Sequence, residues 1–100
     1  QEVIDLLKPH AEDKKNKSAY FFNELGTAYF SKQDNLNANK YFAIAHQLKK
    51  NDPKIIYNLA SSLALLENYE EALKLFNLAE SKGFDKRFIN EWRVWLKEKM

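Results

Sequence analysis

The stretch A-N-K-Y-F-A-I-A at residues 38–45 returns 34 positions later as A-L-K-L-F-N-L-A at residues 72–79. Both stretches place alanine, lysine, phenylalanine and alanine at the same four positions, and Leu25 and Leu59 form another pair at this offset. A set of matches at one period indicates a repeated structural unit. Stacked repeats commonly act as surfaces that hold partners, so the pattern favours a binding function over catalysis.

Other pairs at the same offset keep the type of side chain without its identity. They are Phe22 with Ile56, Gly26 with Ala60, Thr27 with Ser61, Tyr41 with Leu75, and Ile44 with Leu78. Apolar residues are spaced by three and four along the chain, without strict alternation, which predicts amphipathic helices and not strands. The chain has only two glycines, which also argues against strands joined by tight turns.

The composition is that of one soluble folded domain. The chain has 100 residues, of which 45% are hydrophobic and 30% charged, and this balance argues against disorder. The net charge of +2 is too small to indicate nucleic acid or an anionic membrane by itself. Because there is no cysteine, disulfides, thiolate zinc sites and cysteine nucleophiles are excluded.

We expect six helices joined by short loops. The first helix ends at about residue 12, the second runs from Ser18 to about Ser31, and the third runs from Asp34 or Asn35 to about Lys50. The last three helices begin at Asp52-Pro53, at Asn68 and at about Asp85. Asp52 before Pro53 combines a capping carboxylate with a proline at the first helical position. Asn68 followed by Glu71 resembles a capping box, and Gly83 is expected to end the fifth helix.

Each of the last five helices carries an apolar face that we expect to point inward. These faces comprise Phe22, Leu25, Ala28 and Tyr29; Leu36, Ala38, Tyr41, Phe42, Ala45 and Leu48; Ile55, Ile56, Leu59, Ala60 and Leu63; Leu73, Phe76 and Ala79; and Phe88, Ile89, Trp92, Trp95 and Leu96. Gly26 and Ala60 are small, which suits positions where the two helices of one hairpin cross.

The 34-residue period in helix–turn–helix units resembles the tetratricopeptide repeat. The family motif is matched by Phe22, Leu25, Gly26, Tyr29, Ala38, Phe42 and Ala45 in one unit and by Ile56, Leu59, Ala60, Leu63, Ala72, Phe76 and Ala79 in the next. The resemblance implies an all-α fold, a right-handed α-solenoid of antiparallel helix hairpins. The chain departs from the family pattern at Gln33, where a glycine is common, and at Asn35, where an aromatic is usual.

The resemblance also divides the single domain of residues 1–100 into units. Residues 1–18 correspond to the second helix of a preceding repeat plus a connector, 19–52 and 53–86 to two repeats, and 87–100 to a C-terminal capping helix. Arg93 stands where a small residue would be needed if another helix packed there, which suits a helix that closes the array.

In this family the first helix of each unit lines a concave groove, and the resemblance places a partner-binding site there. The residues implied are Tyr20, Asn23, Glu24, Thr27, Phe30, Lys54, Tyr57, Asn58, Ser61 and Leu65, to which the last helix adds Arg87, Glu91 and Trp95. Aromatic rings with amide neighbours suit an extended peptide or a helix. The alternative is that Tyr20, Phe30, Tyr57 and Leu65 only widen the core of a small domain.

Some tetratricopeptide domains clamp a C-terminal carboxylate with converging lysine, asparagine and arginine side chains. Here Asn58 matches an asparagine position and Arg87 approximates a basic one, but Asn23, Thr27 and Glu91 depart from the pattern. A carboxylate needs several donors without a competing anion, so we do not expect this clamp.

We expect a non-enzymatic module that binds a peptide or helix of another protein. No catalytic constellation is visible, and His10 and His46 have no third ligand at metal spacing, so no metal or other cofactor is expected. One alternative is a structural segment that self-associates through the apolar stripe Val3, Ile4, Leu6 and Leu7.

An RNA-binding helical repeat is a further alternative, which the nearly neutral charge argues against. No apolar run is long enough to span a bilayer, so no membrane partner is expected. The composition does not decide the compartment, although a cytoplasmic location is slightly favoured.

Overall fold

The computed structural model describes residues 18–100, and the helix expected near the N-terminus lies outside that range. The described residues form five α-helices and no strand, which confirms the all-α prediction for this part of the chain. The helices are α2 (Ala19–Ser31), α3 (Asn35–Leu48), α4 (Pro53–Leu65), α5 (Tyr69–Ser81) and α6 (Lys86–Lys99).

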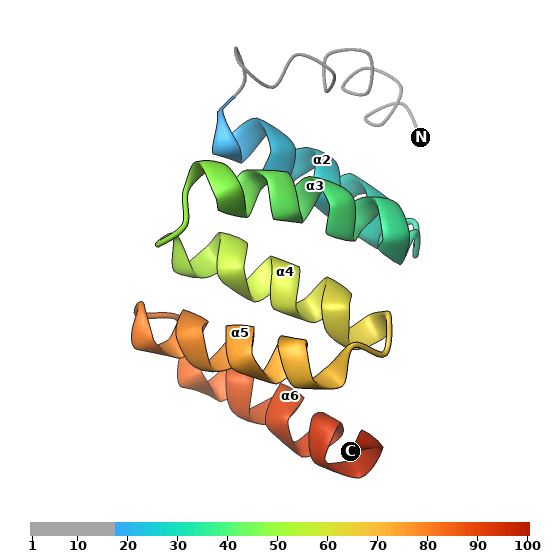
Figure 1. The fold of residues 1–100 in the computed structure, drawn as a ribbon, viewed down its shortest axis with the longest axis vertical. Coiled ribbons are helices and arrows are strands. Elements are labelled where there is room, and N and C mark those ends of the chain that lie inside the picture. The colour runs from blue at the N-terminus through green and yellow to red at the C-terminus, as the bar shows by residue number, and fades with distance from the viewer. Residues whose placement is uncertain (1–17) are drawn as a thin grey trace.

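Successive helices lie side by side, and short loops join them (Figure 1). The closest pairs are α2 with α3 and α4 with α5, so the described chain contains two helix hairpins. Helix α3 packs on α4, and α6 covers the far side of the second hairpin against α5. Each helix therefore packs mainly on its neighbours in the sequence.

Four of the five helices begin with a side-chain cap. Oxygens of Ser18, Asp34, Asp52 and Asp85 accept hydrogen bonds from backbone N–H groups in the first turn of their helices. Asn68 stands at the N-cap of α5, but its side chain makes no capping hydrogen bond, so the capping box expected there is wrong. Instead, Glu70 and Glu71 place negative charge in the first turn of α5, where the helix dipole favours it.

Three helices end in the same backbone turn, although only one of them has a glycine there. Gln33, Glu67 and Gly83 have φ values of 63°, 67° and 108°. After α2, the Gln33 N–H donates to the Phe30 carbonyl and the Asp34 N–H to the Tyr29 carbonyl, and the equivalent bonds follow α4 and α5. This pattern is the Schellman motif. The departure at Gln33 therefore leaves the turn geometry in place.

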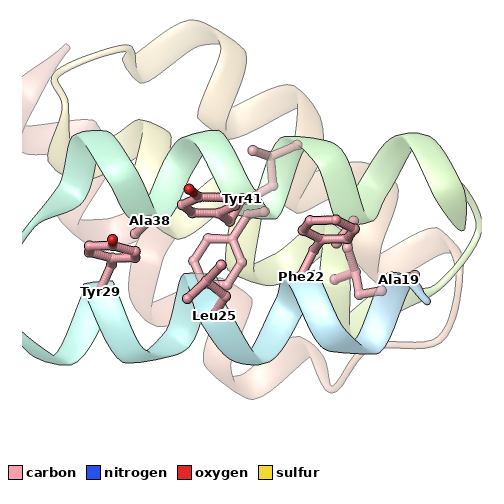
Figure 2. Close-up of a cluster of buried hydrophobic side chains, with 10 residues drawn as sticks. Ala19, Phe22, Leu25, Tyr29, Ala38 and Tyr41 are labelled. Carbon is pink, nitrogen blue, oxygen red and sulfur yellow. The ribbon is translucent and has the colours of Figure 1, made fainter. Parts of the chain in front are cut away.

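The first core cluster lies between α2 and α3, with Ile55 and Leu59 added from α4, and is rich in aromatic rings (Figure 2). Tyr41 stacks between Phe22 and Tyr29, with ring centroids 6.4 and 5.6 Å away. At Gly26 the helices approach so closely that a Cβ atom would lie 2.6 Å from the ring of Phe42. This contact confirms that Gly26 is small because the two helices of the hairpin cross there.

The second core cluster joins α4, α5 and α6. Its buried members are Ile56, Ala60, Ala64, Ala72, Phe76, Ala79, Ile89 and Leu96. The Phe76 ring lies 5.2 Å from Trp92 of α6 and 5.6 Å from Tyr57 of α4, measured between centroids. Helix α6 therefore supplies part of the core of the second hairpin.

Three residues expected to point inward are exposed instead. Leu36 is 74% exposed, and Leu48 and Phe88 are each 49% exposed. Leu36 lies two residues before the buried Ala38, which is more than half a turn around an α-helix, so both cannot share one face. Leu48 is the last residue of α3, and Phe88 lies one position before the buried Ile89, off the stripe that faces the core.

Candidate functional site

Side chains of α2, α3, α4 and α6 meet at a pocket of about 150 Å³. It is lined by Thr27, Phe30, Phe42, Tyr57, Asn58, Ser61 and Trp92. Five of these seven belong to the set that the sequence predicted. Phe42 and Trp92 do not, because their positions on the apolar faces predict core residues. The repeat offers a signal for one of them, since Trp92 lies one period of 34 residues after Asn58.

Two hydrogen bonds link the three helices along this face. The Asn58 Nδ2 atom of α4 donates to the Asn23 Oδ1 atom of α2 over 2.9 Å. The Trp92 Nε1 atom of α6 donates to the Tyr57 hydroxyl of α4, also over 2.9 Å. One bond joins α4 to α2 and the other joins α6 to α4, so Asn58, Tyr57 and Trp92 both line the pocket and link its helices.

Tyr57 and Phe30 are partly core residues. The Tyr57 ring stacks on Phe84 with centroids 4.1 Å apart, and its hydroxyl is engaged by Trp92. Phe30 packs against the first cluster, with its ring 6.3 Å from that of Phe42. Tyr57 and Phe30 thus pack against the core, as the alternative to a binding role expects, and both also line the pocket.

The polar side chains of the predicted set differ in exposure. Asn23 and Ser61 are only 8% and 5% exposed, whereas Thr27 is open to solvent. The hydroxyls of Thr27 and Ser61 donate to the carbonyls of Asn23 and Tyr57 on their own helices, over 2.9 Å in each case. Of the polar side chains that line the pocket, Thr27 is therefore the most exposed, whereas Asn23 is buried outside the lining and contacts it through Asn58.

Tyr20 and Lys54 lie apart from the pocket, near the loop between α3 and α4. The Tyr20 hydroxyl donates to Asp52 Oδ2 over 3.2 Å and accepts from the Lys49 ammonium, which lies 4.5 Å above the tyrosine ring. The hydrogen bond with Tyr20 raises the pKa of Lys49. Lys54 is exposed, with its backbone N–H on Asp52. Glu24 is exposed and lines neither this group nor the pocket.

A second pocket, of about 360 Å³, lies between α4 and α6. Its walls are Leu65, Glu91, Trp92 and Trp95, so Trp92 belongs to both pockets. Leu65 is 40% exposed and is the one member of the predicted ten found here. The first helices of both hairpins and α6 thus share one face that carries two adjoining hollows.

The two arginines of α6 are engaged within the described chain. The Arg87 guanidinium holds the Asp85 carboxylate at 2.6 Å, and this hydrogen-bonded contact lowers the pKa of Asp85 to about 2. Arg93 binds Glu80 at 2.5 Å and Asn77 at 2.7 Å, which ties α6 to α5. Arg87 therefore supports a helix cap, and Arg93 fastens the last helix.

Residues 18–100 contain no group of three His, Asp or Glu side chains that could hold a metal ion. His46 has a buried Nδ1 atom without a hydrogen-bond partner in that range, and burial, followed by the charge of Lys50, lowers its pKa.

None of the described helices is long and apolar enough to cross a bilayer. Comparison with known proteins found no family model that matches the chain and no curated protein with significant similarity to it.

Proposed function

We propose that the chain is a tetratricopeptide-like α-solenoid that acts, without catalysis, as a protein-interaction module. The face of α2, α4 and α6 would take an extended peptide or a helix from a partner protein. The observation that carries this proposal is the pair of adjoining pockets that share Trp92 on that face. Apolar hollows with a few converging polar groups are the usual form of a recognition site.

The repeated sequence supports the solenoid. Hairpins α2–α3 and α4–α5 follow each other at the 34-residue period, and both use alanines and a phenylalanine at the same positions of their second helices. Units that stack in this way leave one helix of each pair on a common surface.

The chemistry of the groove supports a peptide ligand. Phe30, Tyr57 and Trp92 offer apolar contact, while Thr27 and Asn58 offer polar atoms that suit a peptide backbone. The hydrogen bonds from Asn58 to Asn23 and from Trp92 to Tyr57 fix the positions of the helices that line the groove in the absence of a ligand. A site formed in advance loses little conformational entropy on binding.

A peptide-display selection on the immobilised chain tests the proposal. We expect short random-sequence peptides to be enriched, and the Thr27→Lys variant to bind them at least about tenfold more weakly, because a lysine there would fill the first pocket. The matched control is Ser81→Lys, which also replaces a hydroxyl side chain by lysine, at an exposed position of α5. Circular dichroism would verify that both variants remain folded.

The selection has two outcomes that overturn the proposal. One is the absence of any enriched peptide. The other is a set of peptides that Thr27→Lys and Ser81→Lys affect equally, which would place binding away from the groove.

A further inference from the structure

The second pocket has a composition that the first lacks. Two indole rings, Trp92 and Trp95, stand edge to face with centroids 5.4 Å apart, beside Leu65 and the carboxylate of Glu91. In the first pocket, by contrast, no charged side chain lines the wall. The second pocket therefore combines aromatic surface with a fixed negative charge.

The carboxylate of Glu91 is available for a ligand. Glu91 is exposed, and within residues 18–100 it takes part in neither of the two ion pairs, which join Arg87 to Asp85 and Arg93 to Glu80. The basic side chains on the same helix nearest to it are thus already occupied. An anion in this position favours a cationic partner over an acidic or neutral one.

The indole of Trp95 already attracts a cation within the chain. The Lys99 ammonium lies 5.2 Å from the centre of the Trp95 ring, one turn along α6. Tryptophan is the aromatic side chain with the strongest attraction for cations at its face. Glu91 lies one turn before Trp95 on the same helix, so the carboxylate and the ring can act on one ligand group.

We propose that this second pocket binds an arginine side chain of the peptide that occupies the groove. This inference rests on the proposed function, since it describes one residue of that peptide. An arginine has an apolar stem that suits Leu65 and Trp92, and a planar guanidinium that stacks on indole and pairs with a carboxylate. A lysine fits less well, because its ammonium is more strongly hydrated and cannot stack.

The test uses the peptides recovered from the display selection. We expect an arginine to be enriched at one position relative to the others. Replacing this arginine by citrulline, which keeps the shape and removes the charge, should weaken binding to the wild-type chain by about fivefold to tenfold.

Two variants of the chain locate the effect. Glu91→Gln should weaken the arginine peptide about threefold to fivefold and leave the citrulline peptide unchanged. Glu98→Gln, which makes the same change at an exposed position of α6 outside the pocket, should affect neither peptide. Trp95→Leu should reduce the preference for arginine over citrulline by about fivefold.

The outcomes separate the two proposals. Peptides that bind the groove without arginine enrichment, or an equal effect of Glu91→Gln on both peptides, overturn the arginine pocket and leave the interaction module standing. If no peptide is enriched, or none responds to Thr27→Lys, both proposals fall.

Discussion

The two hairpins share one sequence register but fill their cores differently. At five equivalent positions the first hairpin has an aromatic residue where the second has an aliphatic one: Phe21 and Ile55, Phe22 and Ile56, Tyr29 and Leu63, Phe30 and Ala64, Tyr41 and Leu75. The first core is a stack of its own rings, whereas the second obtains ring contacts from Phe84 and from α6. Two hairpins with the same sequence register can thus fill their cores with side chains from different parts of the chain.

We expect the largest loss of stability from removing the Trp92 ring, which α6 contributes to the core of the second hairpin. Trp92→Ala removes the stack on Phe76 and the hydrogen bond to Tyr57, so we expect it to lower the free energy of unfolding by about 3 kcal/mol. Tyr41→Leu, which gives the first hairpin the residue that the second has at Leu75, should cost only about 1 kcal/mol. Urea unfolding followed by circular dichroism measures both. Equal losses would contradict the difference between the two cores.

An intermediate effect should follow from exchanging the small residues at the two helix crossings. In Gly26→Ala the new Cβ would lie 2.6 Å from Phe42, so the ring must move, and we expect a net loss of about 1–2 kcal/mol despite the better helix propensity of alanine. Ala60→Gly should also destabilise, by about 1 kcal/mol, because it removes a buried methyl group and frees the unfolded backbone.

A second substitution should recover part of the stability that Gly26→Ala removes. Combining Gly26→Ala with Phe42→Leu relieves the contact, so the added cost of Gly26→Ala should be smaller in the Phe42→Leu background than alone. A double-mutant cycle in urea measures this coupling. Strict additivity of the two substitutions would show that the Phe42 ring is not what requires glycine.

The smallest effect should come from the turns, where the hairpins agree. Gln33→Gly and Glu67→Gly place glycine at positive φ, and each should raise the free energy of unfolding by about 0.5–1 kcal/mol. Gly83→Ala tests the reverse: a Cβ there meets open space, so any loss, expected at about 1 kcal/mol, reports backbone strain alone. Thermal unfolding gives the order of the three. A loss of stability in Gln33→Gly would overturn this account of the turns.

Helix positions could be predicted from the sequence because their signals are local. Asp52 with Pro53 marks the start of α4, and Gly83 marks the turn after α5, without reference to the rest of the chain. Local signals also have limits. Asn68 has the right residue type for a cap and makes no capping bond, and Leu36 is apolar yet exposed, because a side chain's direction depends on its place around the helix.

The candidate site was harder to predict because it depends on pairs of helices. The residues Asn23 and Asn58 are 35 apart and not 34, so the repeat register alone does not pair them. The sequence places Tyr57 among the partner-binding residues, but in the structure Phe84 stacks on its ring and Trp92 donates a hydrogen bond to its hydroxyl. A residue's exposure in a stack is settled by the next helix, and a single helical pattern carries no information about that neighbour.

The two hydrogen bonds that link α2, α4 and α6 have a mechanical consequence. The bonds from Asn58 to Asn23 and from Trp92 to Tyr57 cross the same side of the stack, one after the other. Bending the array so that this side opens stretches both, and each opposes the motion with about 0.5–1.5 kcal/mol before it breaks. The two side-chain links therefore make the packing of α2, α4 and α6 more resistant to separation on this side than the ring contacts alone would.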